Sequence, residues 1–116
     1  MTNQEIFDTA VTHLRKQNRK SIDETKNCLY RGPDGTKCAV GCFIPDDKYS
    51  SRMEGESIDT LGKEYLFIRN LFSAEQICML LSDIQTIHDL SSVVDWESEF
   101  DELATSYHLT YTPPNK

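Results

Sequence analysis

Three cysteines and one histidine are the residues of this chain whose types could do chemistry together. They are Cys28, Cys38, Cys42 and His88. Thiolate sulfur and imidazole nitrogen are ligands that Zn²⁺ prefers in proteins, but the spacing C-x9-C-x3-C lacks the C-x2-C pair that makes zinc motifs specific. Cysteine also packs readily as a small apolar residue. We therefore expect no cofactor, and we keep a zinc site at these four residues as the alternative.

The same residues could instead form a thiol active site. A nucleophilic cysteine needs a neighbouring base and an electropositive, accessible setting. Cys38 or Cys42 could be the nucleophile, but no motif selects one of them. His88 and Asp89 could supply the base, although a histidine on an apolar helix face is more often a core residue. We expect a protein that is not an enzyme, with a small metal- or thiol-dependent enzyme or ligand-binding domain as the alternative.

Charge is divided sharply along the chain, whose net charge is −7. Residues 1–70 carry eleven Lys or Arg against eleven Asp or Glu, whereas beyond Arg69 the only basic residue is Lys116, against eight acidic ones. An acidic surface repels nucleic-acid phosphates and attracts basic surfaces, which predicts a protein partner and no direct nucleic-acid binding. The blander alternative is that these charges only keep helices solvated. The candidate partner-binding residues are Asp95, Glu97, Glu99, Asp101 and Glu102.

Capping boxes predict where two helices begin, because Thr2 is followed by Glu5 and Ser73 by Gln76. Each box precedes an apolar stripe at helical spacing, and the first helix should end near Asn18. The stripe after Ser73 comprises Ile77, Leu80, Leu81, Ile84 and Ile87, with His88 beside them. A third stripe predicts a last helix through Trp96, Phe100, Leu103, Ala104 and Tyr107.

Between these helices, residues 28–40 predict a β-hairpin with its turn at 33–35, Pro-Asp-Gly. In the expected register Cys28 and Cys38 lie on one face of the hairpin. Residues 58–72 favour a helix that breaks at Gly62, with a helix followed by a strand as the alternative, so that residues 62–72, like residues 38–44, could be strand or helix. Only a helical turn would bring Cys38 and Cys42 close enough to share a metal.

These elements predict an α+β fold, a helix-rich single domain with one small β-hairpin. The domain should span residues 1–110, followed by an extended tail over 111–116. The chain has no run of eighteen apolar residues and no basic-then-apolar start, so we expect neither a membrane span nor a signal peptide. We expect a cytoplasmic protein with reduced thiols, because the cysteines do not form the framework of a secreted domain.

The segment RGPDGTKCAVGCFIPDD is the most specific part of the sequence as a family marker. Together with later residues it resembles a family of small proteins encoded by phages and prophages, for which no activity is established. The later matching residues are Tyr49, Met53, Glu54, Gly55, Leu81, Gln85, Ile87, His88, Asp89 and Trp96. The resemblance runs from Ile6 to about Tyr107 and transfers no catalytic residue.

The resemblance implies a phage or prophage gene product in the cytoplasm of a bacterial host. Small acidic phage proteins often bind a host protein, and we apply this to the present chain by analogy. We therefore expect an interaction protein that inhibits or redirects a host protein, such as a defence or nucleic-acid-handling system, through its acidic C-terminal surface. A virion or replication accessory subunit is a further alternative. The sequence leaves the partner and the oligomeric state open.

Overall fold

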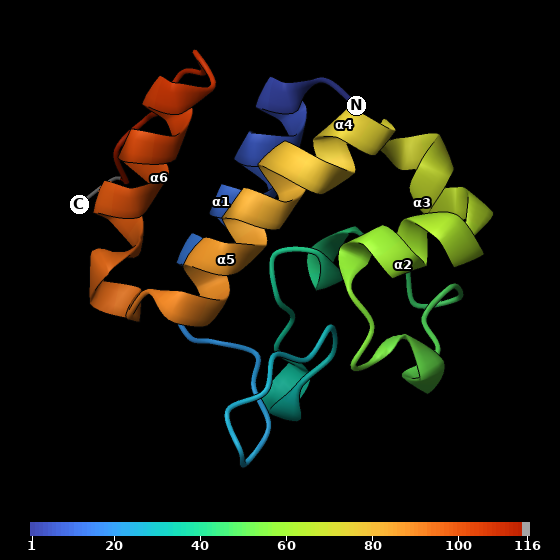
Figure 1. Ribbon diagram of the computed structural model, residues 1–116. Coiled ribbons are helices and arrows are strands. Elements are labelled where there is room, and N and C mark those ends of the chain that lie inside the picture. Colours follow the sequence, from blue (N-terminus) through green and yellow to red (C-terminus); the bar gives the residue numbers. More distant parts are fainter. Residues whose placement is uncertain (115–116) are drawn as a thin grey trace.

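Helices make up the regular structure of this protein. The computed structural model describes residues 1–114, in which no strand occurs and the only β-type pairing is an isolated bridge between Ile22 and Cys28. The prediction of an α+β domain is therefore wrong, and the fold is all-α (Figure 1). Over the described residues, no helix has both the length and the apolar character needed to cross a membrane.

The first helix, α1 (Asn3–Gln17), begins at the predicted capping box. The Thr2 hydroxyl accepts a hydrogen bond from the Glu5 N–H, and the Glu5 carboxylate accepts one from the Thr2 N–H. The helix ends at Asn18, which adopts the left-handed conformation with φ of 53°. The predicted start and end of this helix are confirmed.

The second predicted helix is continuous from Ala74 to Leu90 but not uniform. Its sections are α4 (Ala74–Gln76), a π-helical turn η4 (Ile77–Leu81) and α5 (Ser82–Leu90). The Ser73 capping box is present. A π turn holds more residues than an α turn, so it changes which side chains of α5 share a face with those of α4. The sequence predicts the helix and its apolar stripe but not this turn.

The segment before it forms two short helices, α2 (Ile58–Glu64) and α3 (Leu66–Leu71). The predicted helix is confirmed, but the break lies at Tyr65, whose backbone is extended, and not at Gly62. Gly62 lies inside α2, where a Cβ would approach the Ile77 side chain to 2.9 Å. The glycine therefore permits close packing of α2 against the π turn.

The last helix, α6 (Trp96–Ser106), follows a short 3₁₀ turn, η5 (Val93–Asp95). Residues 109–114 then run without regular structure along α1, where the Gln4 side chain bonds both backbone groups of Thr110. The expected extended tail spans 111–116, and its last two residues lie outside the described range.

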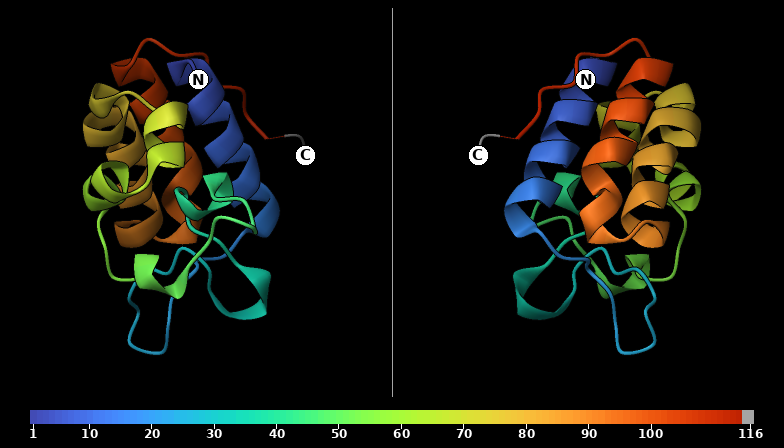
Figure 2. Two further views of the ribbon diagram at one scale, coloured as in Figure 1. Left: turned by 90° about the vertical axis from the view of Figure 1, so that its right-hand side faces the viewer. Right: turned by 90° about the vertical axis from the view of Figure 1, so that its left-hand side faces the viewer.

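The long helices form a layer in which α1, α5 and α6 lie side by side (Figure 2). The buried side chains between them come from the three predicted stripes. The largest of them include Ile6, Phe7, Leu14, Leu80, Leu81, Ile84 and Phe100. Residues 18–57 are mostly irregular and cover the end of this layer where α1 and α5 terminate (Figures 1 and 2).

The predicted hairpin over residues 28–40 does not form. Its turn is present as the 3₁₀ turn η1 (Pro33–Gly35), in which Gly35 has φ of +74° and the Thr36 N–H donates to the Pro33 carbonyl. Beyond the Gly32–Thr36 hydrogen bond that closes this turn, the flanking segments do not pair as strands. Pro-Asp-Gly therefore determined a turn and not a hairpin.

Side chains occupy the backbone donors that a hairpin ladder would need. The Glu54 carboxylate accepts hydrogen bonds from the N–H groups of Tyr30 and Arg31, at 2.8 and 3.1 Å. The Val40 N–H donates to Oε1 of Gln85 at 3.0 Å. Because these groups are satisfied by distant side chains, the two arms of the turn are held apart, and the region folds as an ordered irregular segment.

Candidate functional site

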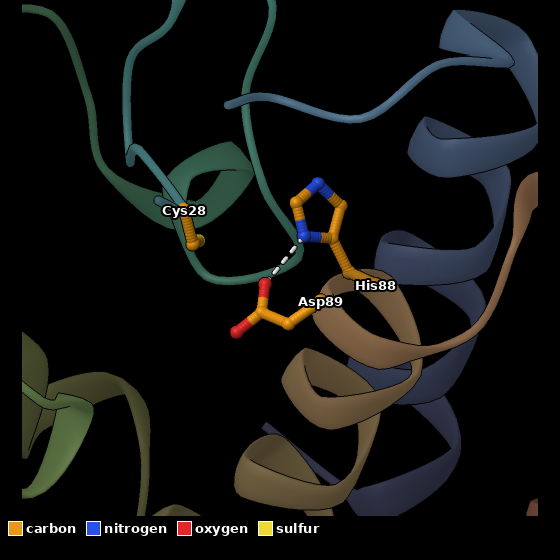
Figure 3. A group of neighbouring side chains, drawn as sticks. All are labelled: Cys28, His88 and Asp89. Atoms are coloured by element: carbon orange, nitrogen blue, oxygen red, sulfur yellow. Dashed lines mark hydrogen bonds and ion pairs between the residues drawn. The ribbon is translucent and has the colours of Figure 1, made fainter. Parts of the chain in front are cut away.

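Cys28, His88 and Asp89 meet where the irregular segment covers the end of α5 (Figure 3). Their possible ligand atoms all lie within 4.8 Å of one another. Cys28 is held there by its bridge to Ile22, and the other two residues belong to the last turn of α5. The sequence anticipated Cys28 and His88 in one metal site with Cys38 and Cys42, and it paired Asp89 with His88 only in the thiol alternative. The Cys38 thiol does lie beside Cys28, whereas that of Cys42 bonds the Ala39 carbonyl.

His88 is completely buried, and both of its ring nitrogens are engaged. The Ser21 N–H donates to Nε2 at 3.0 Å, and Nδ1 lies 2.7 Å from Oδ1 of Asp89. Since Nε2 must carry a lone pair to accept from Ser21, the proton lies on Nδ1 and is donated to Asp89. The ring also lies 5.8 Å from that of Trp96, centroid to centroid. His88 therefore connects residues 18–57 to the helical layer.

Gln85 completes this cluster and is the residue whose role the sequence did not reveal. Its side-chain oxygen accepts from the Val40 N–H, and its amide nitrogen donates to Sγ of Cys28 and to Oδ1 of Asp89, each at 2.9 Å. Gln85 and Asp89 are four residues apart on α5, so their helical spacing is the signal that could have found the pair.

The surroundings of Cys28 and Cys42 favour the protonated thiol. The pKa of Cys28 is strongly raised by the neighbouring Cys38 thiol and by burial, and the His88 contact offsets this only in part. Burial raises the pKa of Cys42 to about 12. Burial by itself lowers the pKa of His88, but the hydrogen bonds to Asp89 and Cys28 outweigh it and the net change is upward. The Ser21 N–H opposes protonation, because an imidazolium has no lone pair to accept it.

This arrangement is poorly suited to thiol catalysis. A base must have a nitrogen free to take the proton of the thiol. Nε2 of His88 is engaged by Ser21, and Nδ1 already carries the proton given to Asp89. The raised pKa of Cys28 acts in the same direction, since the thiol is the less reactive form.

The same hydrogen bonds disfavour a metal at this cluster. A cation bound to Nδ1 of His88 would need the lone pair there, and Nε2 would then carry a proton facing the Ser21 N–H. The cysteines predicted as further ligands are used differently. Residues 38–42 form the helical turn that the metal hypothesis requires, since the Cys42 N–H donates to the Cys38 carbonyl. However, Sγ of Cys42 donates to the Ala39 carbonyl.

Next to the cluster lies a hollow of about 410 Å³, between α5 and the start of α2. We call it the Asp89 hollow. Its lining residues are Cys28, Tyr30, Gly55, Glu56, Ser57, Ile58, Ser82, Gln85, Thr86 and Asp89. A hollow of this size is in the range of small-molecule sites, and its polar residues lie on two sides of it.

The five acidic residues predicted to bind a partner do not form one uniform surface. Glu97 makes a two-point ion pair with Arg15, at 2.7 and 2.8 Å, and accepts from the Tyr111 hydroxyl. The Arg15 hydrogen bonds lower the pKa of Glu97. Glu97 therefore fastens α6 to α1. Asp95, Asp101 and Glu102 are exposed and Glu99 is half-buried. Asp95 also accepts from the Ser92 hydroxyl.

A groove of about 230 Å³ between α5 and α6 brings further carboxylates beside this surface. We call it the α5–α6 groove. It is lined by Asp83, Thr86, Ile87, Glu99, Glu102, Leu103 and Ser106. None of these residues is basic, and Asp83 accepts a hydrogen bond from the Tyr107 hydroxyl at 2.6 Å.

Comparison of this chain with protein-family models, with curated protein sequences and with solved structures found no match.

Proposed function

We propose that this protein is a non-enzymatic interaction protein that binds a host or phage protein through the acidic face of α5 and α6. The observation that carries the proposal is the α5–α6 groove, which is lined by three carboxylates and two apolar side chains and by no basic residue. The carboxylates belong to Asp83, Glu99 and Glu102, and the apolar side chains to Ile87 and Leu103. Such a groove attracts a basic segment that also carries an apolar side chain.

Exposed apolar side chains near the same helix pair support this proposal. Leu90 at the end of α5 and Val94 before α6 are 79% and 87% exposed. Aliphatic groups this exposed gain from burial in an interface, while the carboxylates orient the approaching partner. Asp95 and Asp101 extend the negative charge along α6.

The resemblance to phage and prophage proteins suggests the setting. In that setting the protein acts in the bacterial cytoplasm, and its partner is a host protein with a basic groove, such as one that handles nucleic acid or takes part in defence. The acidic face of α5 and α6 would occupy the partner's basic groove and so inhibit or redirect the host protein. A virion or replication subunit is the competing role, which predicts co-purification with other phage proteins.

Affinity capture from the bacterial host, followed by mass spectrometry, tests the proposal. The informative variant is Glu99→Lys with Glu102→Lys, because it reverses the groove's charge and leaves the Arg15–Glu97 pair intact. We expect the captured protein to bind this variant at least about tenfold more weakly, with an unchanged melting temperature.

The matched control is Glu24→Lys with Glu64→Lys, which changes the net charge equally at exposed positions outside the groove. It should bind as the wild type does. If both double variants bind alike, the partner does not recognise the groove, and the proposal is wrong.

A further inference from the structure

The Asp89 hollow has a chemistry of its own, separate from the α5–α6 groove. Apart from the Ser82 hydroxyl, the oxygen and nitrogen donors of its side chains are already used inside the protein. The Tyr30 hydroxyl donates to the Glu56 carbonyl, the Thr86 hydroxyl to the Ser82 carbonyl, and the Ser57 hydroxyl to Thr60. The Gln85 amide donates to Cys28 and Asp89. What these groups still offer to a ligand is mainly lone pairs.

Asp89 is the strongest acceptor in the hollow, and its carboxylate is already oriented. Oδ1 accepts from Nδ1 of His88 and from the Gln85 amide. Figure 3 shows the other carboxylate oxygen pointing away from the imidazole. Within residues 1–114, no hydrogen bond or ion pair uses that oxygen, Oδ2. A charged acceptor held in place by a buried histidine binds a donor with little loss of side-chain entropy.

The charges around the hollow select the type of ligand. Glu56 is the second acidic residue in the lining, and none of the ten lining residues is basic. The Lys20 ammonium reaches this end of α5, where it donates to the Asp89 backbone carbonyl and not to the carboxylate. An anionic ligand would therefore meet two carboxylates, whereas a cation that carries several N–H donors would satisfy the remaining acceptors.

We propose that the Asp89 hollow binds an alkylguanidinium or alkylammonium group, which pairs with Oδ2 of Asp89. The π turn η4 ends directly before Ser82, and from there Ser82, Gln85 and Asp89 share the face of α5 that borders the hollow. π turns frequently occur at functional sites. The cation could belong to a small molecule or to a basic side chain of a polypeptide, and both sources share this recognition.

Titration of the ¹⁵N-labelled protein, followed by amide chemical shifts, tests this site. The probes are agmatine as the free cation, a capped Gly-Gly-Arg-Gly-Gly peptide as the side-chain source, and N-butylurea as a neutral analogue. We expect saturable shifts at Gly55, Ser82, Gln85 and Asp89 with at least one cation. N-butylurea should bind at least about tenfold more weakly than that cation, or show no binding. The cation that binds more tightly identifies the source.

The sharpest variant is Asp89→Asn. The amide oxygen of asparagine can still accept from His88 and Gln85, while its NH₂ group replaces Oδ2, so the internal contacts remain and cation binding should fall at least about tenfold. Ser82→Leu fills the hollow without changing Asp89 and should also prevent binding. Asp47→Asn is the matched control, because Asp47 is exposed and lies outside the hollow, and it should bind normally.

Absence of saturable shifts with both cations would overturn the proposal, as would equal binding by the wild type and Asp89→Asn. Neither result bears on the α5–α6 groove, since the two sites share only Thr86. The proposed partner binding and the cation site can therefore fail independently.

Discussion

The helical layer and the irregular segment over residues 18–57 both bury apolar side chains, but the segment also depends on polar side chains to satisfy its backbone. In the layer, apolar side chains from α1, α5 and α6 bury one another, with Phe100 and Ile84 completely inaccessible. In the segment, Val40, Ile44 and Met53 join that core, but the backbone has no regular pairing and bonds instead to a few polar side chains, chiefly Glu54 and Gln85. Apolar burial is distributed over many contacts, whereas a polar anchor concentrates several hydrogen bonds in one residue.

This difference predicts different consequences when one residue is removed. Loss of a core side chain should weaken the entire protein, because all three long helices share the core. Loss of a polar anchor should release the segment first and leave the helices folded, as expected where stability is not uniform. Because the Asp89 hollow lies between the two regions, it should depend on both.

The largest expected effect is that of Phe100→Ala in the helical layer. Removing this fully buried ring should lower the free energy of unfolding by about 4 kcal/mol. Chemical denaturation measures the loss, and hydrogen exchange should accelerate in α1, α5 and α6 together. If exchange accelerated only in α6, the layer would not be one cooperative unit.

A smaller and more local effect is expected for Glu54→Ala. The substitution removes the acceptor of the Tyr30 and Arg31 N–H groups and of the Tyr49 hydroxyl, at a cost of about 3 kcal/mol. Hydrogen exchange should accelerate in residues 28–57, while the amides of α1 and α6 keep their protection. Equal acceleration in the helices would contradict the contrast between the two regions.

The smallest effect concerns His13, through which α1 contacts the segment. Nε2 of His13 lies 2.8 Å from the Lys37 carbonyl. Burial lowers the pKa of His13, more than its hydrogen bond to that carbonyl raises it. Below its ordinary pKa of about 6.5, the unfolded chain therefore binds more protons than the folded one. The stability due to neutral His13 is present above that pH and is lost as the pH falls through the folded pKa.

The variant His13→Gln isolates this contribution from that of His88. The stability difference between wild type and variant should shrink as the pH is lowered from about 7.5 to about 5. Denaturation at several pH values measures it, and NMR titration gives the pKa of His13 directly. A difference that grew on acidification would mean that His13 is stabilised in its charged form.

Local sequence patterns predicted the helices well, because the information lies within a few residues. The capping boxes at Thr2 and Ser73 satisfy the first N–H groups of their own helices, and the apolar stripes repeat at the helical period. The break between α2 and α3 was placed three residues early, at Gly62 in place of Tyr65. A glycine is a helix breaker by propensity, but here it is retained in the helix by close packing.

The candidate site could be predicted only in part. Residue type by itself groups Cys28 with His88 as possible metal ligands. The hydrogen bond that determines the His88 tautomer is not visible in the sequence, because its donor, the Ser21 N–H, lies 67 positions away. The acidic pattern does not distinguish Glu97 from its neighbours, because its partner Arg15 lies 82 positions away in the sequence. Contacts at such separations leave no periodic signal in one chain.

The sequence by itself determined the helices, their apolar faces, the turn at Pro33–Gly35 and the concentration of acidic residues beyond Arg69. These follow from propensity, capping and composition, which act locally. Only the tertiary structure decided that residues 28–40 form no hairpin, that Glu97 pairs with Arg15, and that Asp89 borders a hollow. The physical reason is that each of these depends on where a backbone donor or a charge finds its partner, and here those partners come from distant parts of the chain.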